Sequence, residues 1–278
     1  MFTLNCKGQL LIVDKPLVMG IINVTPDSFY EKSRSPVTEA ALAQAEKFVH
    51  ESVDIVDIGG QSTRPGSEPL DAEEELARVL PVITAIHQQY PDLIISIDTY
   101  FALVAKTAVE AGASIVNDIS AGRFDPAMLP TVAGLGVPYI LMHMKGTPRD
   151  MQQQAHFTDL TMEVLDFFTT QINKLEKMGI MDIIIDPGFG FAKTAEQNFA
   201  LLHDLPVFSM LKRPVLMGIS RKSTVYKTLG VSPEDALNGT TVLNTIGLMN
   251  GASLLRVHDV KAAKEAVILW NAVHEKTR

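Results

Sequence analysis

The sequence contains one cysteine, one tryptophan and no cluster of basic residues, and each of these scarcities excludes a class of protein. Cys6 has no partner for an internal disulfide or a structural zinc site, so we expect a reducing compartment, the cytoplasm. The 24 Lys and Arg residues are outnumbered by 32 Asp and Glu, which gives a formal charge of −8. An acidic chain without a dense basic patch is not expected to bind nucleic acid or a membrane surface. We therefore expect a small ligand.

Long hydrophobic runs and linkers are also lacking. The apolar stretch 10–24 is broken by Asp14, Lys15 and Pro16, well short of the roughly 20 apolar residues that span a bilayer, so neither a membrane helix nor a signal peptide is expected. No segment rich in Ser, Gly and Pro divides the chain. A barrel of alternating strands and helices typically takes about 250 residues as one unit, so residues 1–278 are expected to form a single domain.

Eight short apolar runs recur along the chain, and a segment with helical character follows each of them. Runs that are continuously apolar are typical of parallel strands buried on both faces. The runs are LVMGIINV (17–24), DIVDIGG (54–60), LIISIDT (93–99), SIVNDIS (114–120), YILMHM (139–144), DIIIDPG (182–188), PVLMGIS (214–220) and SLLRVH (253–258). Because no GxGxxG turn follows the first run, a (β/α)8 TIM barrel is favoured over an open doubly wound sheet. The segment 4–16, with its Lys-Gly turn, is compatible with an N-terminal β-hairpin on the barrel floor.

Polar residues close nearly every expected strand. In this architecture the active site is built at the carboxyl ends of the strands, so these residues are expected to converge on one rim. Several carboxylates around one cavity need cationic or donor-rich partners, which a ligand can supply. The residues are Asn23, Asp57, Asp98, Asn117, Asp118, His143, Asp186, Ser220, Arg221, Lys222, Arg256 and His258.

Two groups of these residues suggest two kinds of contact. Asn23, Arg256 and His258 come from the first and last strands, which are neighbours in a closed barrel, and Arg offers a donor fork suited to phosphate oxygens. Asn23 could complete the shell of a Mg²⁺ ion held mainly by phosphate and water.

The second group faces the first. Asp98, Asn117, Asp186 and Lys222 form a wall suited to a planar heterocycle with N–H donors and a carbonyl acceptor. A glycosidase pair of carboxylates is an alternative, but the chain lacks an aromatic sugar platform, since its only Trp lies in the last helix. A serine nucleophile has no GxSxG setting.

Seven motifs at these strand ends together resemble the dihydropteroate synthase family. They are NVTPDSF (23–29), DIGGQSTRPG (57–66), SIDT (96–99), NDIS (117–120), DPGFGFAKT (186–194), GISRKS (218–223) and RVHD (256–259). The resemblance runs from about residue 17 to the last helix. Pterin-dependent methyltransferases are similar in the pterin pocket, but they would not be expected to carry both the STRPG and the SRKS blocks.

The resemblance implies an enzyme of folate biosynthesis. This transferase would condense 6-hydroxymethyl-7,8-dihydropterin diphosphate with 4-aminobenzoate to give 7,8-dihydropteroate and diphosphate. Its catalytic residues would be Lys222, Arg256, Asp98 and Asp186. The pterin would be held by Asp98, Asn117, Met142, Asp186, Gly218, Lys222 and Arg256, with Ile119 and Phe191 lining the pocket.

The same resemblance assigns the remaining contacts. Diphosphate would meet Asn23, Thr63, Arg256 and His258, and Asn23 would bind Mg²⁺. The aminobenzoate would lie among Thr63, Arg64, Pro65, Phe189, Lys222 and Ser223. A homodimer through helices of the outer ring is also implied.

Two departures from the family pattern are present. The first loop reads DSFYEKSRSP, without the glycines that members commonly have there, and Gln61 stands where Glu is frequent. A neutral bond should therefore replace any salt bridge made at position 61. The alternative from another class is a noncatalytic barrel that binds a pterin or an anion, which the intact STRPG and SRKS blocks disfavour.

Overall fold

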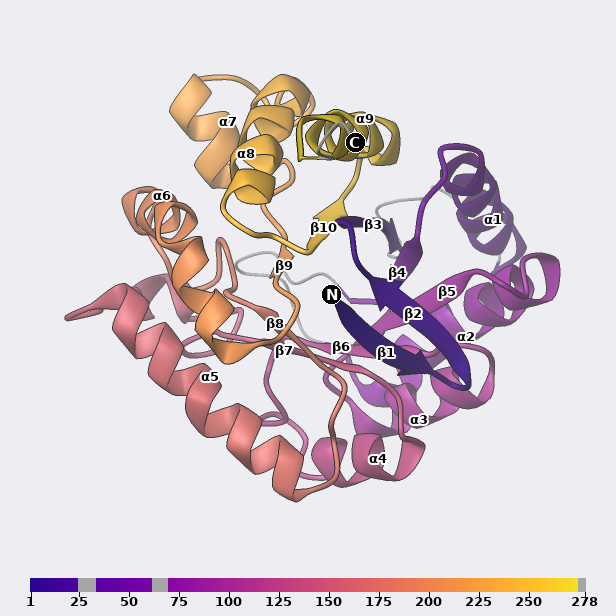
Figure 1. Cartoon of the computed structure of the whole chain (residues 1–278). Coiled ribbons are helices and arrows are strands. Elements are labelled where there is room, and N and C mark those ends of the chain that lie inside the picture. The colour runs from indigo at the N-terminus through magenta and orange to yellow at the C-terminus, as the bar shows by residue number, and fades with distance from the viewer. Residues whose placement is uncertain (25–33, 62–69, 275–278) are drawn as a thin grey trace.

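The predicted barrel is confirmed by a computed structural model that describes residues 1–24, 34–61 and 70–274, except for the side chains of residues 34–36. Eight parallel strands form one sheet in the order β8-β7-β6-β5-β4-β3-β10-β9, and helices surround it (Figure 1). The strands are β3 (Leu17–Asn23), β4 (Ile55–Gly59), β5 (Ile94–Asp98), β6 (Ile115–Asp118), β7 (Tyr139–Met142), β8 (Ile183–Asp186), β9 (Leu216–Met217) and β10 (Leu254–Val257).

The helices follow the strands around the outside of the barrel. They are α1 (Arg34–His50), α2 (Ala72–Gln89), α3 (Ala102–Glu110), α4 (Met128–Leu135), α5 (Leu160–Lys177), α6 (Ala195–His203), α7 (Ser223–Leu229), α8 (Leu237–Met249) and α9 (Val260–His274), with short 3-10 turns at Met151–Gln154 and Leu205–Leu211. No helix in the described ranges is long and apolar enough to cross a membrane.

The barrel closes at β9, where the structure differs from the expected strand. We expected residues 214–220 to be extended, but β9 has only two residues and pairs with β10. The chain turns directly after it, since Arg221 has a φ of 52° and the amide of Lys222 donates to the Ile219 carbonyl. One isolated bridge between Ile185 and Val215 joins β8 to this segment. Helix α7, which sequence reasoning missed, follows this turn and α8 comes after it.

The inner faces of the strands change character along the barrel axis. Near the amino ends a buried apolar cluster forms a floor from Leu17, Met19, Ile55, Ile94, Ile115, Ile140, Ile184, Leu216 and Leu254. Successive residues of a strand alternate between faces, so the residues two positions further on face the same interior. These residues include Asp57, Asn117, Met142, Asp186, Gly218 and Arg256.

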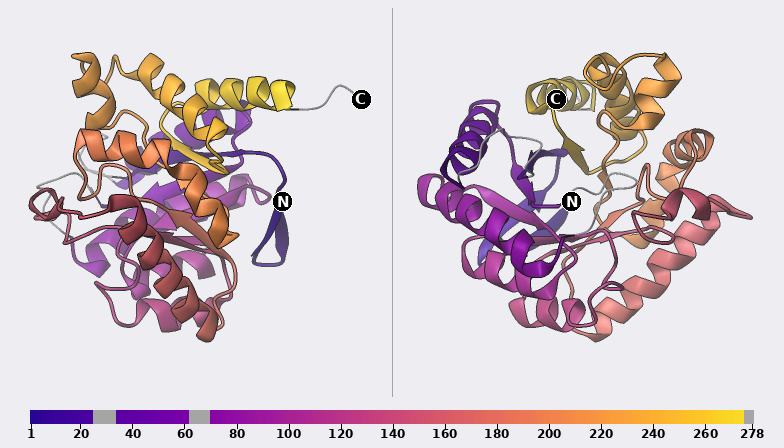
Figure 2. Two further views of the ribbon diagram at one scale, coloured as in Figure 1. Left: turned by 60° about the vertical axis from the view of Figure 1, so that its left-hand side comes forward. Right: turned by 180° about the vertical axis from the view of Figure 1, so that it is seen from behind.

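The predicted N-terminal hairpin is confirmed and covers this floor. Strands β1 (Phe2–Cys6) and β2 (Gln9–Val13) pair antiparallel, and the two-residue turn between them has positive φ at Lys7 (54°) and Gly8 (91°). Both values suit a tight hairpin turn. The hairpin lies across one end of the barrel (Figures 1 and 2), and Leu4, Cys6 and Val13 join the floor cluster. The opposite end is therefore the one available for a ligand.

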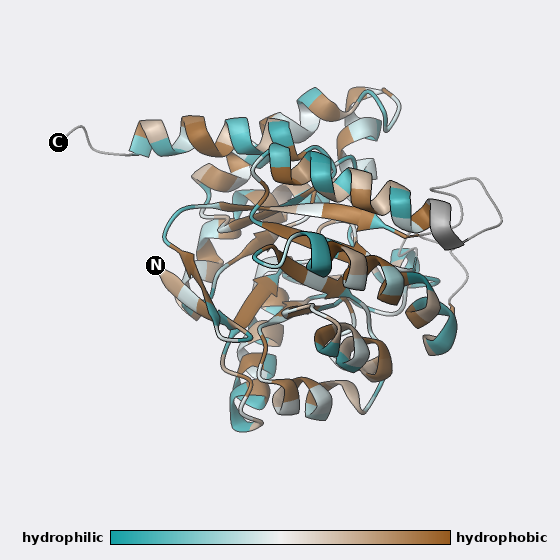
Figure 3. Cartoon of the chain, turned by 90° about the vertical axis from the view of Figure 1, so that its right-hand side faces the viewer, coloured by the Kyte–Doolittle hydropathy of each residue, from teal (hydrophilic) through white to brown (hydrophobic). Residues whose placement is uncertain are grey.

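The outer faces of the strands pack against the helices. Gly20 lets α1 and α9 approach β3, because a Cβ there would lie 2.7 Å from the Phe48 ring and 2.9 Å from Val260. The strands are mostly hydrophobic while the helices combine both kinds of residue (Figure 3), as expected when only one helix face is buried. Since floor and shell are both filled, chemistry is confined to the carboxyl ends.

Candidate active site at the barrel mouth

An arginine on β10 reaches across the mouth of the barrel to two carboxylates. Arg256 Nε lies 2.6 Å from Asp57 Oδ2, and its terminal nitrogen lies 2.7 Å from Asp98 Oδ2. The sequence analysis placed Arg256 on a phosphate-binding wall opposite Asp98, so this pairing links the two expected walls. A planar guanidinium between two carboxylates fixes the position of all three charges.

Asp57 was expected at the rim, but no contact with a ligand was assigned to it. It is fully buried, and besides Arg256 it accepts a hydrogen bond of 3.1 Å from Asn117 Nδ2. Its other oxygen has no partner among the described residues. Alternation along the strand predicts its direction, because Asp57 lies two residues before Gly59 and so faces the same side of β4. Gly59 pairs in register with Asp98. Asp57 thus ties Asn117 and Arg256 into one network.

Lys222 and Asp186 occupy the adjoining part of the mouth. Lys222 precedes α7, and its ammonium donates to the Phe189 carbonyl and lies 4.6 Å above the Phe191 ring. Asp186 ends β8, and one of its oxygens accepts a 2.8 Å bond from the Gly188 amide. Gly218 leaves room here, since a Cβ would lie 3.9 Å from both Lys222 Nζ and Arg256 Cβ. The predicted site residues at the ends of β8, β9 and β10 are therefore neighbours.

Burial and mutual charge shift the ionisation of this group. Burial raises the pKa of Asp98 to about 7, against the opposing attraction of Arg256. Burial also raises the pKa of Asp186, which Lys222 opposes, and lowers the pKa of Lys222 to about 8, which Asp186 opposes. Asp57 and Asp98 raise the pKa of Arg256 in spite of its burial. A ligand that donates N–H groups to these carboxyls would favour their ionised form and lower their pKa.

An apolar cluster lines the same mouth. Met142, Ile119 and Phe191, all expected there, pack with Met144, Met151 and Ala192, and Tyr100 and Phe124 lie against them. Phe189 is also buried. An apolar surface beside a few fixed polar groups is typical of a site for a flat, small ligand.

The strands β3 and β10 supply a more open part of the rim. Asn23 is exposed at the end of β3 and pairs in register with Gly59. His258 is exposed, and its Nδ1 lies 3.1 Å from Ser220 Oγ. Ser223, also exposed, begins α7. Within the described ranges no group of three His, Cys, Asp or Glu residues could hold a metal ion by itself.

Two polar strand ends do not face the mouth as expected. Asp118 and His143 each follow an inward residue, so the alternation of the strand turns both outward. Asp118 accepts bonds from the Ser120 and Gly122 amides and from the Tyr139 hydroxyl. His143 contacts Lys193 at 3.1 Å and stacks edge-on against Phe167. The expectation that all these polar ends converge on one rim was wrong for these two.

The second loop lies mostly outside the described residues. Thr63, Arg64 and Pro65 belong to it, as the segment 25–33 belongs to the first loop, so their expected roles stay predictions. Gln61 is described, and Tyr100 donates a hydrogen bond to its Oε1, the neutral bond expected for Gln at this position.

Glu75 is a buried acidic residue that sequence reasoning missed. It lies beside Gly60 in the first turn of α2, and neither of its oxygens has a partner of good geometry among the described residues. Burial raises its pKa to about 8, against the opposing influence of Thr99 and Gln61.

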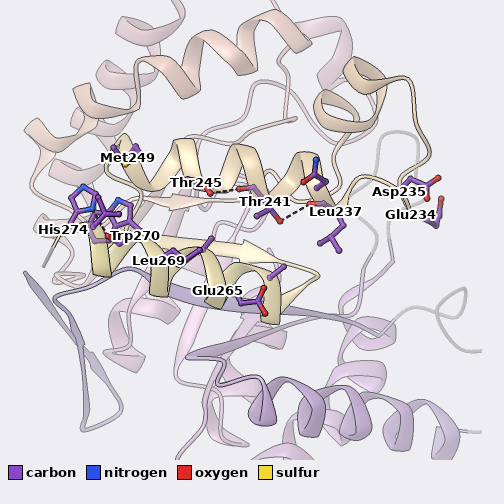
Figure 4. A pocket seen from close by; sticks show the side chains of 14 residues that line it. Glu234, Asp235, Leu237, Thr241, Thr245, Met249, Glu265, Leu269, Trp270 and His274 are labelled. Carbon is purple, nitrogen blue, oxygen red and sulfur yellow. Dashed lines mark hydrogen bonds between the residues drawn. The ribbon is translucent and has the colours of Figure 1, made fainter.

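A groove of about 740 Å³ lies away from the mouth, between α8 and α9 (Figure 4). Leu237, Met249, Leu269 and Trp270 contribute to its apolar lining, and Glu265 lies at its edge. It contains none of the residues of the mouth described above. This groove and the charged cluster are therefore separate features.

Known proteins similar to this chain are pterin-binding enzymes. Residues 19–258 match the family described as pterin binding enzyme. The dihydropteroate synthase of Synechocystis sp. is 44% identical over 260 residues, covering 91% of this chain and 90% of the relative. That of Escherichia coli is 40% identical over 266 residues, covering 95% and 94%. The solved Xanthomonas albilineans dihydropteroate synthase with 4-aminobenzoic acid has a TM-score of 0.92 and 42% identity, covering 99% and 98%, and its complex with 7,8-dihydropteroate has a TM-score of 0.89 and 40% identity, covering 99% of each chain.

Proposed function

We propose how the barrel mouth carries out its reaction, given that the chain belongs to the dihydropteroate synthase family of pterin-binding enzymes. Members of this family are transferases of folate biosynthesis. The reaction joins 6-hydroxymethyl-7,8-dihydropterin diphosphate and 4-aminobenzoate, and it releases diphosphate as 7,8-dihydropteroate forms. The observation that carries the assignment of residues is the meeting of Asp98, Asn117, Asp186 and Lys222 around one buried mouth.

The pterin is held by the buried polar groups. Asp186 and Asp98 accept N–H donors of the ring, Asn117 supplies an amide, and Lys222 donates to a ring acceptor. Met142 and Ile119 cover the flat face of the ring, since they line the apolar part of the mouth. Arg256 connects the pterin side with the leaving group, because its guanidinium already neutralises Asp57 and Asp98. A pterin that donates to Asp98 would free one side of that guanidinium for phosphate oxygens.

The chemical step breaks the carbon–oxygen bond between the pterin methylene and the diphosphate. Negative charge grows on the leaving oxygen, where Arg256 and His258 stabilise it, and positive charge grows on the methylene, where Asp98 and Asp186 provide a favourable field. The amine of 4-aminobenzoate is neutral near pH 7 and attacks the methylene without a strong base, and its nitrogen loses one proton to water once the carbon–nitrogen bond has formed. Lys222 acts as an ammonium donor, because its pKa of about 8 keeps it mainly charged at pH 7.

Asn23 is the described residue that would help to hold a magnesium ion bound with the diphosphate. The described residues offer Asn23 as a neutral oxygen ligand and no cage of acidic residues, which fits an ion held mainly by phosphate and water. When bound, the ion would withdraw charge from the leaving diphosphate. Asn23→Leu should weaken binding of the pterin diphosphate and spare a pterin without phosphates, as measured by calorimetry. Equal losses for both ligands would contradict this role for Asn23.

The aminobenzoate lies beside the pterin on the α7 side. Phe189, Lys222 and Ser223 form the described part of its site, and Thr63, Arg64 and Pro65 of the second loop complete it in the proposal. The N-terminal turn of α7 suits a carboxylate, since free amides and a lysine are present there.

Diphosphate release is the measurement that tests this function. Release should require both substrates and magnesium, and it should stop when either substrate is omitted. Lys264→Met serves as a control for a substitution outside the mouth. It removes a part-buried lysine bonded to Asp54 at 2.8 Å and should release diphosphate at the normal rate. Pterin binding without release of diphosphate would instead support the noncatalytic barrel.

A second copy of the chain is the proposed partner. The α8–α9 groove is lined by exposed Leu237, Met249, Leu269 and Val273, an apolar surface of the kind that homodimers cover. Glu substituted for Leu269 should convert the dimer to a monomer in light scattering, whereas Glu substituted for the equally exposed Met210, which lies outside the groove, should not. A monomeric wild-type protein would contradict this proposal.

The chain is also proposed to be one domain that acts in the cytoplasm. Hairpin and barrel share the floor cluster, which supports a single unit over residues 1–278. Cys6 is a free, buried thiol, which is usual in a reducing compartment. One cooperative unfolding transition, seen by two spectroscopic probes, is the expected result.

A further inference from the structure

Lys193 is a buried lysine that the proposed reaction does not use. Its side chain is only 3% exposed, and its ammonium has three partners at 3.1 Å: His143 Nδ1, the Gly188 carbonyl and the Phe191 carbonyl. An ammonium has three donors, so these partners satisfy all of them. A full set of bonds in a buried place indicates a residue with a structural task and not a chance contact.

The partners of Lys193 belong to the end of β7 and to the loop that follows β8. Gly188 adopts a φ of 73°, and a Cβ there would lie 2.0 Å from the His143 carbonyl, so this loop passes directly against the end of β7. The same loop begins after Asp186, whose carboxylate accepts from the Gly188 amide. Lys193 therefore fixes the backbone that orients Asp186.

A second lysine contacts this loop from the side of the mouth. Lys222 donates to the Phe189 carbonyl and lies above the Phe191 ring, while Lys193 holds the carbonyl of that same Phe191 from behind. Asn198 adds a further bond by accepting from the Gly190 amide at 2.8 Å. Lys193, Asn198 and Lys222 thus all bond to this loop, and of the two lysines only Lys222 belongs to the proposed pterin site.

Charge explains why the bonds to Lys193 matter. Burial lowers the pKa of Lys193 to about 7, and the nearby Asp186 opposes that change, whereas Lys222 and Lys145 add to it. Burial, Lys193, Lys145 and Arg123 lower the pKa of His143, so its ring is neutral and Nδ1 can accept a hydrogen bond. An ammonium in this place depends on its three acceptors, and the acceptors are held in place by it.

We propose that Lys193 is a positioning residue of the pterin site, which holds His143, Gly188 and Phe191 together so that Asp186 and the Phe189 carbonyl face the pterin and Lys222. The inference rests on the proposed function, since it names what fixes that wall. Lys193 does not touch the substrate, because it lies behind the loop. Removing it should therefore change pterin binding through Asp186 and Lys222.

Lys193→Met is the variant that tests this role, because Met keeps the length of the side chain and removes its donors. The dissociation constant for 6-hydroxymethyl-7,8-dihydropterin diphosphate with magnesium should rise about tenfold in calorimetry, and the KM for it should rise with a smaller change in kcat. Lys264→Met removes a part-buried lysine far from the loop and should leave both values unchanged. Wild-type affinity in Lys193→Met would overturn the inference.

His143 provides a second pair of variants that does not require Lys193→Met to fold. His143→Asn keeps an acceptor near the place of Nδ1 and should bind the pterin within about twofold of wild type, whereas His143→Leu removes the acceptor and should bind about tenfold more weakly. Equal affinities in the two variants would overturn the inference.

A double variant separates positioning from stability. Lys193→Met combined with His143→Leu replaces the lysine and its side-chain acceptor by apolar groups, so the urea midpoint should recover in part relative to Lys193→Met. Pterin affinity should stay low, because the Gly188 and Phe191 carbonyls still lack their donor. Recovery of affinity together with stability would show a merely structural role and overturn the inference. Wild-type protein that binds no pterin would instead overturn the proposed function, and with it the inference.

Discussion

The two ends of the barrel are built on the same strands and differ almost completely. At the floor, Met19, Ile55 and Ile184 are fully buried and belong to one apolar cluster with residues of the hairpin. Two residues further along the same inward faces, β4 and β8 present Asp57 and Asp186 to the mouth. One strand thus supplies apolar packing at its beginning and chemistry at its end.

The difference shows where stability and activity reside. Burial of the floor residues stabilises the folded state by about 25 cal/mol for each Å² of apolar surface removed from water. At the mouth the charged forms are disfavoured: the pKa of Asp98 is raised to about 7 and that of Lys222 is lowered to about 8, both chiefly by burial. Truncating a floor side chain should therefore lower stability and leave the activity unchanged. Removing a charge at the mouth should lower the activity without unfolding the protein.

Ile184→Ala is the change expected to have the largest effect, and it concerns the floor. The side chain is 0% exposed, and its removal leaves a cavity among close-packed neighbours, which should lower the free energy of unfolding by roughly 4 kcal/mol. Urea denaturation measures this loss. The kcat/KM per folded molecule should stay within about twofold of wild type, and a large drop in it would break the division between the two ends.

Asp186→Ala is the matching change at the mouth of the same strand. The pterin would lose the carboxylate that accepts its donors, so pterin affinity and kcat/KM should fall roughly 100-fold, about 3 kcal/mol. The free energy of unfolding should change by less than about 1 kcal/mol, because loss of the Gly188 bond is offset by removal of a buried charge. Wild-type affinity for the pterin in calorimetry would contradict the assignment.

The sequence predicted the barrel because both faces of every strand are buried, which makes the runs continuously apolar. It predicted the hairpin from the Lys-Gly turn, since that pair adopts positive φ. It missed α7, whose seven residues STVYKTL carry no clear helical pattern. The short β9 was overestimated because the apolar run PVLMGIS continues past Met217, where β9 ends, up to the turn at Arg221.

The site was predicted less completely, for physical reasons that concern side-chain direction. Position at a strand end does not distinguish inward from outward residues, so Asp118 and His143 were assigned to the mouth beside Asp57. Alternation along each strand separates them, because Asp118 and His143 directly follow Asn117 and Met142, which face inward. Glu75 could have been found as well, because it lies four residues before the buried Val79 on the inward face of α2.

Glu75→Gln sharpens the comparison, because it changes a buried acid beside Gly60 to which no contact with a substrate is assigned. The folded pKa of about 8 lies above the ordinary 4.5, so the folded state holds a proton that the unfolded state releases, and wild-type stability falls as pH rises from 4.5 to 8. The full shift corresponds to about 5 kcal/mol at pH 8. Burying the Gln amide without a partner costs about 1 to 3 kcal/mol of this.

The variant should therefore reverse its effect with pH. At pH 8 it should be more stable than wild type by about 2 kcal/mol, and at pH 5 it should be less stable by about 1 kcal/mol. Urea denaturation at the two pH values measures both. If the variant and the wild type differed by the same free energy of unfolding at both pH values, Glu75 would have an ordinary pKa. The shifted ionisation would then be confined to the residues that meet the pterin.

The smallest expected effect is the pH dependence of pterin binding, about tenfold for each pH unit on either side of a maximum. Asp98 must be ionised to accept donors, and its pKa is about 7, so affinity should rise as pH increases toward 7. Lys222 must be charged to donate, and its pKa is about 8, so affinity should fall as pH increases beyond 8. The maximum should lie between these values.

Calorimetry with 6-hydroxymethyl-7,8-dihydropterin, which lacks phosphates, keeps phosphate ionisation out of the profile. Asp98→Asn should remove the acid limb and Lys222→Met the alkaline limb, and each variant should keep the other limb. The floor offers an internal control, because burial raises the pKa of its Cys6 to about 12 and the thiol stays neutral from pH 6 to 9. Cys6→Ala should therefore leave both limbs in place. If Cys6→Ala moved either limb, or if the wild-type profile were flat, the ionisation that governs binding would not belong to the mouth, and the division between the two ends of the barrel would fail.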